Sequence, residues 1–215
     1  DNISHSIDGG SIAGSTLNVK NGTLTISDSS IDKTYINVDS NGFVDLESLS
    51  GTVSANLSGA GSISQDSSDI EIVGDNSKFT GTYSIYEGKL TLSENSFFGP
   101  GSKTSLNTSD LTWNLNSNDN NDNNKILNGT NYSNVILRNG STFSIIGNNI
   151  TQNVTIGNGL WTSDGSENSL NFSKASFVLG DGLPTDIFNF NNANVTLTLD
   201  NTTAYNMNLN NSKLD

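Results

Sequence analysis

Leu24-Thr25-Ile26, repeated as Val44-Asp45-Leu46, is the stretch of sequence that decides the fold. In most copies two apolar side chains flank a polar or β-branched one, and a spacing of two is the period of a half-buried β-strand. The triplet returns at irregular steps that are close to the length of one solenoid repeat. Its later copies are Ile70-Glu71-Ile72, Leu90-Thr91-Leu92, Leu111-Thr112-Trp113, Val135-Ile136-Leu137, Val154-Thr155-Ile156, Phe177-Val178-Leu179 and Val195-Thr196-Leu197.

The composition agrees with a solenoid of many short strands. Only 32% of the 215 residues are hydrophobic and 14% are charged, and the polar remainder is mostly Asn, Ser, Thr and Gly. Weaker strands, such as Tyr83-Ser84-Ile85, lie between the strong triplets, and no segment as long as an ordinary helix has helical periodicity. We therefore expect an all-β protein, a right-handed parallel β-helix of about ten coils that forms a single domain over residues 1–215.

Turn dipeptides keep one alternative fold open. Asn-Gly occurs at residues 21–22, 41–42, 128–129, 139–140 and 158–159. These pairs tolerate positive φ, so they suit the corners of a solenoid and equally the turns of hairpins. An antiparallel β-sandwich is therefore the alternative, although its turns would be expected at a shorter spacing than that of the triplets.

A polar run over residues 116–125 has no apolar member and cannot join a core. We expect it to project from the rod as a loop, or to be a short joint between residues 1–115 and 126–215. Its oxygens suggest calcium, but the spacing of Asp119 and Asp122 lacks the pattern of a known calcium loop, so a solvated loop is favoured.

Charge and cysteine content exclude several classes of function. The net charge is −13 and only nine residues are Lys or Arg, so no basic stripe is available for nucleic acid or for an anionic membrane. The chain has no cysteine and no apolar run that is long enough to span a membrane. It begins at Asp1 without a signal sequence, and we expect it to be a fragment of a longer bacterial exported protein.

The sequence contains few candidate catalytic residues. His5 is the only histidine, and a histidine this close to a terminus is expected to be solvated. The nearest carboxylate cluster is Asp66, Asp69 and Glu71, in which the last two share an outward strand face. Arg138 has no basic neighbours that would support a polysaccharide lyase. The sequence predicts no enzyme, no catalytic residue, no metal site and no cofactor.

Aromatic and loop residues are the candidates for binding a partner. Trp113 falls inside a triplet and is expected in the core, and Tyr83, Tyr86 and Tyr132 are further aromatics that could form a surface. Trp161 lies at a coil edge, where exposure is more plausible than for Trp113, but core packing is favoured there as well. The binding candidates from the sequence are Asn118, Asp119, Asp122, Lys125 and Trp161.

One segment resembles a known family. Residues 59–92 contain Gly59-Ala60-Gly61-Ser62-Ile63, then Asn76-Ser77-Lys78-Phe79-Thr80-Gly81, then Gly88-Lys89-Leu90-Thr91-Leu92. This order is similar to the β-strand repeat of bacterial autotransporter passenger domains, and Asn21-Gly22-Thr23-Leu24-Thr25-Ile26 resembles a partial second copy. The resemblance is confined to this part of the chain, and elsewhere the G-x-G and F-T-G elements are missing.

The resemblance implies a right-handed β-helix that is exported through a C-terminal membrane barrel, which this chain lacks, and that reaches the cell surface or is secreted. It also implies adhesion or virulence. The function expected is a non-enzymatic adhesin fragment that binds a host or bacterial surface protein or glycan, as a monomer. A polysaccharide-active β-helix enzyme and a purely structural stalk are the alternatives.

Overall fold

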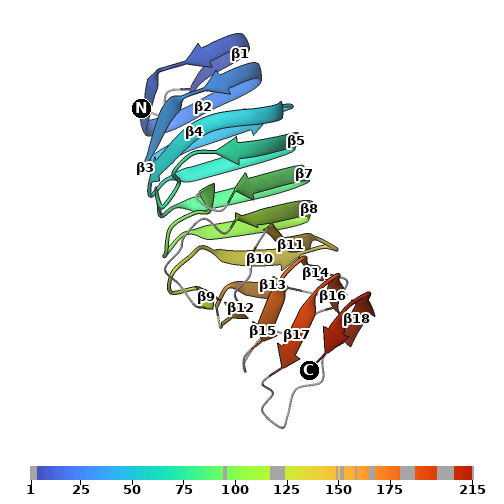
Figure 1. Cartoon of the computed structure of the whole chain (residues 1–215). Coiled ribbons are helices and arrows are strands. Elements are labelled where there is room, and N and C mark those ends of the chain that lie inside the picture. Colours follow the sequence, from blue (N-terminus) through green and yellow to red (C-terminus); the bar gives the residue numbers. More distant parts are fainter. Residues whose placement is uncertain are drawn as a thin grey trace.

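The computed structural model describes residues 4–93, 96–116, 124–148, 150, 153–157, 159–164, 168–179, 187–197 and 206–214. Over these residues the chain is a β-solenoid of about nine turns with almost no helix. The strands follow one another from β1 to β18, and the two termini lie toward opposite ends (Figure 1). Every strand pair in this part of the chain is parallel, which confirms the predicted β-helix and excludes the sandwich. The right-handed winding stays a prediction.

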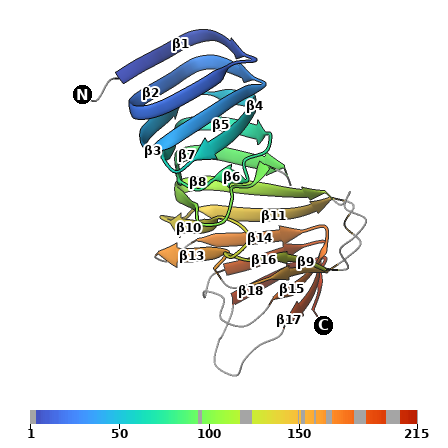
Figure 2. The same ribbon diagram turned by 90° about the vertical axis from the view of Figure 1, so that its left-hand side faces the viewer.

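Each complete turn has three walls, which strand β2 (Thr16–Asp32) shows within one continuous strand. Residues 16–19 belong to wall A, residues 23–27 to wall B and residues 29–32 to wall C. Residues 16–19 pair with 35–38 of the next turn, residues 23–27 pair with 43–47, and residues 29–32 pair with 10–13 of the first turn. The chain therefore passes from A to B to C in every turn, and Figure 2 shows the bends between the walls edge-on.

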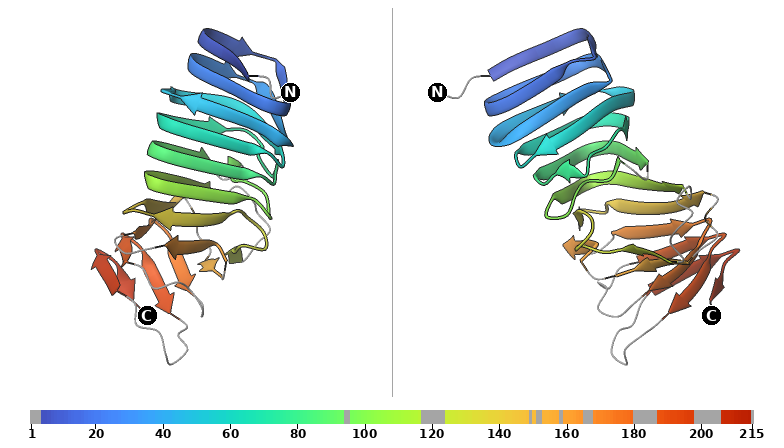
Figure 3. Two further views of the ribbon diagram at one scale, coloured as in Figure 1. Left: turned by 180° about the vertical axis from the view of Figure 1, so that it is seen from behind. Right: turned by 60° about the vertical axis from the view of Figure 1, so that its left-hand side comes forward.

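In the first half of the rod the strands are long and pass around corners. They are β1 (Ser4–Ala13), β2, β3 (Thr34–Glu47), β4 (Ser50–Gly59), β5 (Ser62–Val73), β7 (Thr82–Ser93) and β8 (Lys103–Asn116). The exception is the two-residue strand β6 (Lys78–Phe79), which pairs with the end of β4 in wall A. In the second half each strand lies within one wall. Wall A then contains β9 (Asn124–Leu127), β12 (Asn153–Ile156), β15 (Ser176–Leu179), β17 (Asn194–Leu197) and β19 (Lys213–Leu214). Wall B contains β10 (Asn134–Arg138) and β13 (Trp161–Asp164), and wall C contains β11 (Thr142–Asn148), β14 (Ser169–Ser173), β16 (Ile187–Asn191) and β18 (Asn206–Asn210). Figure 3 shows the same order from behind and from one side.

Alternate residues of each strand fill the column inside the walls. In wall C, Leu111 and Trp113 of β8 lie in register with Phe143 and Ile145 of β11, and all four side chains are fully buried. Trp113 also stacks on Phe97, with 3.9 Å between ring centroids. The prediction that Trp113 packs in the core is therefore confirmed.

The corners between walls hold residues in the left-handed backbone conformation. At the B–C corner these include Asp28, Ser67, Glu87 and Thr108, with φ between 45° and 53°. The residue after this position carries a buried hydroxyl in two of these turns, at Ser68 and Ser109. Ser109 N–H donates to Ser141 Oγ over 3.2 Å, and Ser141 N–H donates to Asn168 Oδ1 over 3.0 Å. Side chains of one turn thus satisfy corner amides of the turn before it.

The polar run at residues 116–125 begins and ends within strands. Asn116 is the last residue of β8, and Asn124 and Lys125 are the first residues of β9, so these three residues of the run belong to strands. Residues 117–123 lie outside the described part of the chain. In the described residues no helix is long and apolar enough to cross a membrane.

Candidate functional site

Of the five binding residues expected from the sequence, only Lys125 and Trp161 fall within the described residues. Asn118, Asp119 and Asp122 lie outside the described residues. Lys125 is described through its backbone, which pairs with Val154 in wall A. Trp161 is only 1% exposed and meets Phe188 edge-to-face with 5.9 Å between ring centroids. Core packing is thus confirmed for Trp161, and it has no face left for an external ligand.

The carboxylates considered for catalysis lie on two different walls. Asp66 is on the outer side of wall B, whereas Asp69 and Glu71 are on the outer side of wall C. All three side chains are exposed, so the expectation of an outward, solvated face is confirmed. His5 is exposed in β1, in register with Leu24, at the N-terminal end of the rod. No group of three or more His, Asp or Glu side chains in the described residues could hold a metal ion.

One outer row of wall B gathers charged, polar and aromatic side chains in register. We call it the wall B row, and its members are Asp8, Ser27, Glu47, Asp66, Tyr86, Asn107 and Arg138. Tyr86 is 45% exposed near the middle of the row, and Arg138 Nη1 donates a hydrogen bond to Ser105 Oγ over 3.1 Å. The row carries carboxylates at Asp8, Glu47 and Asp66 and a guanidinium at Arg138, and Asp164 is in register with Arg138 in the next turn.

Burial and charge repulsion raise the pKa of one carboxyl group in the acidic part of this surface. Asp45 precedes Glu47 by two positions and shares its outer face of β3, and the pKa of Asp45 is raised above the usual 3.8. Partial burial of the carboxyl group is the largest cause, followed by its hydrogen bond with Glu47 and by the charges of Glu47 and Asp66. A partner that brings positive charge to this surface would relieve the repulsion.

Strand alternation places two tyrosines that could both have formed a surface on opposite sides of wall B. Tyr83 and Tyr86 are three positions apart in β7, so they face opposite sides of wall B. Tyr83 is fully buried, and its hydroxyl donates to Gln65 Oε1 over 3.1 Å. Among the aromatic candidates for a binding surface, Tyr86 can be recognised from the sequence, because the alternation of β7 turns its side chain outward.

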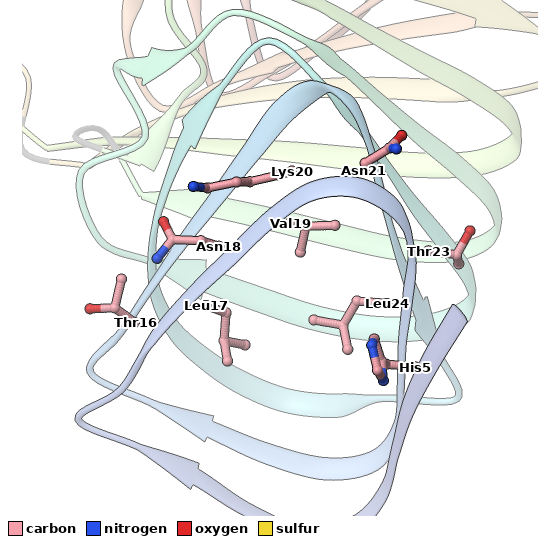
Figure 4. A pocket seen from close by; sticks show the side chains of 9 residues that line it. All are labelled: His5, Thr16, Leu17, Asn18, Val19, Lys20, Asn21, Thr23 and Leu24. Atoms are coloured by element: carbon pink, nitrogen blue, oxygen red, sulfur yellow. The ribbon is translucent and has the colours of Figure 1, made fainter. Parts of the chain in front are cut away.

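A cavity of about 440 Å³ opens at the N-terminal end of the rod. Figure 4 shows Leu17, Val19 and Leu24 directed into it from β2, with His5 of β1 at its rim. These apolar residues belong to the inner side of walls A and B, so the cavity is the interior of the first turns where they open to solvent. Its lining carries one imidazole and one ammonium group, from His5 and Lys20, and otherwise apolar, hydroxyl and amide groups.

Comparison of the chain with protein-family models, with curated proteins and with solved structures found no match.

Proposed function

We propose that this chain is a non-enzymatic segment of a bacterial cell-surface or secreted adhesin of the autotransporter type. In this proposal the solenoid carries a binding surface away from the cell. The partner is a surface protein or glycan of a host or of another bacterium. The wall B row, with Tyr86 at its centre, supplies the contacts.

The rod geometry is the observation that carries the proposal. Each turn adds one strand to a wall, so outer side chains keep their register and form long rows at strand spacing. A partly exposed tyrosine within a row of charges is the kind of residue that dominates the energy of protein interfaces. Its neighbours Asp66 and Asn107 offer acceptor and donor groups on both sides.

The residues that resemble the autotransporter repeat have defined parts in this rod. Asn76 is buried, and its side chain links three turns by accepting from Leu57 N–H and donating to Ser96 O, each over 2.8 Å. Phe79 is fully buried against Phe98. Gly81 lies directly against Gly61 of the neighbouring turn. These contacts support a shared coil design, and the surface location and adhesion come from the resemblance alone.

An adherence assay on displayed protein tests the proposal. The chain would be displayed on a non-adherent bacterium, and binding to host cells and to bacteria would be counted for the wild type and for two tyrosine variants. We expect Tyr86→Ala to reduce adherence by about tenfold, because an interface tyrosine commonly contributes more than ~1 kcal/mol. Tyr35→Ala is the matched control, since Tyr35 is 58% exposed on wall A.

A further variant tests whether residues 117–123, and not the wall B row, supply the binding surface. Replacing residues 117–123 with a Gly-Ser linker of equal length keeps β8 and β9 intact. Unchanged adherence in this variant removes the loop from the binding surface. Adherence of the displayed wild type at the level of the empty display strain would refute the adhesin proposal.

A further inference from the structure

Four Asn-Gly pairs lie in the described residues, at 21–22, 41–42, 128–129 and 139–140. In an Asn-Gly pair the backbone nitrogen of glycine can attack the side-chain amide of asparagine, because glycine has no Cβ that hinders the approach. The sequence offers this reaction equally at every pair. The structure distinguishes the pairs, because the two groups can meet only where the backbone opens at low cost.

Two of the pairs lie inside the sheet. Asn21 and Gly22 are in register with Asn41 and Gly42 between β2 and β3. Both glycines are buried, and a Cβ at Gly42 would overlap Val19 O, so the backbone there is packed on the neighbouring turn. Opening either pair requires two long strands to part.

The third pair is held through its side chain and its backbone. Asn128 Oδ1 accepts from Thr130 N–H and from Asn131 N–H, each over 3.1 Å. Gly129 lies against the backbone of Gly159 in a neighbouring turn, since a Cβ on Gly129 would come within 2.2 Å of Gly159 O. Rotation of Asn128 toward the nitrogen of Gly129 would therefore break several contacts at once.

Asn139 and Gly140 lie in the turn between β10 and β11, outside both strands. Both residues are exposed, and no other described atom comes within 4 Å of the place of a Cβ on Gly140. Their φ values are 53° and 74°, and Ser141 N–H donates to Arg138 O over 3.2 Å, as in a type I′ turn. The hydrogen bond of such a turn does not use the N–H of Gly140.

The side chain of Asn139 makes one contact across turns, in which its Nδ2 donates to Asn107 Oδ1. This hydrogen bond is exposed. Opening the turn breaks this bond and the bond between Ser141 and Arg138, and it leaves the pairing of β10 and β11 with their neighbours in place. This pair therefore opens at the least cost of the four.

We propose that Asn139 is the site of spontaneous deamidation among these four pairs. The nitrogen of Gly140 attacks Asn139 Cγ, the bond from Cγ to Nδ2 breaks, and the side-chain nitrogen leaves as ammonia with the proton of the attacking nitrogen. The product is a five-membered succinimide. Water then adds to one of its two carbonyl carbons. Breaking the new bond to Cγ gives aspartate, and breaking the original peptide bond gives isoaspartate.

Either product changes the contact between two turns. Neither has a side-chain amide at position 139 that could donate to Asn107 Oδ1. Isoaspartate also adds one carbon to the main chain of the short connection between β10 and β11. At neutral pH each product adds a negative charge next to Asn107, which belongs to the wall B row. The reaction itself needs only water, so this inference does not rest on the proposed adhesion.

Peptide mass spectrometry tests the proposal on the wild type. The protein is incubated at mildly alkaline pH, either folded or unfolded in urea, and is then digested with pepsin in acid, where the reaction is slow. Fragment spectra give the fraction of each asparagine that has become an acid. In urea the four pairs should react at similar rates, because they are the same dipeptide.

In the folded protein we expect Asn139 to react about tenfold faster than Asn21, Asn41 or Asn128. Such a ratio requires a difference of only ~1.4 kcal/mol in the free energy of local opening.

Ion-exchange chromatography of intact variants tests the same site. Incubated wild type should develop a more acidic peak, and Asn139→Gly should form this peak more slowly. Asn139→Gly keeps the turn, because Gly-Gly also forms type I′ turns. Asn41→Gly is the matched control and should form the peak at the wild-type rate. If circular dichroism shows that Asn139→Gly has lost its sheet, Asn139→Gln replaces it, because ring closure through the longer side chain is slower.

Two results would overturn the proposal. One is conversion of Asn139 in the folded protein that is no faster than conversion of Asn21, Asn41 and Asn128. The other is an acidic peak that forms as fast in a folded Asn139 variant as in the wild type.

Discussion

Buried polar side chains complete the hydrogen bonds that the solenoid walls leave open. Gln65 is fully buried, and its Nε2 donates to Ser68 O over 2.7 Å and to Lys89 O over 2.9 Å. Its Oε1 accepts from the Tyr83 hydroxyl. Gln65 occupies the inner row that Leu46 and Ile85 fill in the turns on either side. The column therefore includes a satisfied polar layer at this turn.

Tyr83→Phe should weaken this layer without leaving a void. The substitution removes the donor to Gln65 Oε1, and a buried acceptor without a partner costs about 1–3 kcal/mol. We expect the free energy of unfolding, measured with urea, to fall by this amount. Tyr86→Phe is the control, because its hydroxyl is on the exposed side of the same strand. A loss in Tyr86→Phe equal to that in Tyr83→Phe would contradict the account.

Asp45→Asn should stabilise the fold at neutral pH. The pKa of Asp45 is raised above 3.8 in the folded protein, so its protonated form is favoured by folding. Its contribution is therefore greatest below pH 3.8 and is lost as pH rises through the folded pKa. Melting temperatures should be higher for Asp45→Asn than for wild type at pH 7, and the gap should close as pH falls toward 4. A difference in melting temperature that stays constant between pH 7 and 4 would contradict the raised pKa of Asp45 as its cause.

At the scale of elements, close contact between successive turns depends on particular glycines. Gly81 precedes β7 and lies against the backbone of Gly61, which precedes β5. A Cβ at Gly81 would overlap Gly61 O, and Gly81 has no positive φ, so space alone requires glycine there. The hydrogen bond from Thr82 N–H to Gly61 O, at 3.1 Å, shows how closely these turns approach.

Gly81→Ala should separate two turns and should cost about 3 kcal/mol or more, as overpacking against rigid backbone does. Gly140→Ala is the control. Gly140 has open space around it but a φ of 74°, so this variant is destabilised by backbone conformation and not by lack of space. We expect a loss of about 1–2 kcal/mol for Gly140→Ala, from the left-handed conformation alone. Denaturant unfolding of both variants measures the difference, and equal losses would contradict the role of close approach.

At the scale of the whole molecule, each turn contacts only its neighbours. Stability then accumulates along the rod, and turns with a neighbour on both sides are held more firmly than the end turns. Hydrogen exchange should therefore be slowest in β5, β7 and β8 and fastest in β1, β18 and β19. Mass spectrometry of peptic fragments measures this gradient, and uniform protection along the chain would contradict it.

The sequence by itself determined the parallel solenoid and the inward residues of its strands. The period of two within each triplet fixes which side of a strand is buried, and the recurrence of the triplet along the chain fixes the stacking of similar turns. It also placed Trp113 in the core and Asp69 and Glu71 outside. The choice of inward and outward residues is local, because it follows from the alternation of a single strand.

Only the tertiary structure assigned the triplets to walls. Leu24 and Val44 pair in wall B, but the next triplet, at Ile70, lies in wall C, and Val44 pairs instead with Ile63. Triplets in all three walls look alike in sequence, because any wall needs only alternating apolar residues. The packing of the closed turn decides which wall a strand joins, and the register of whole turns brings the members of the wall B row together.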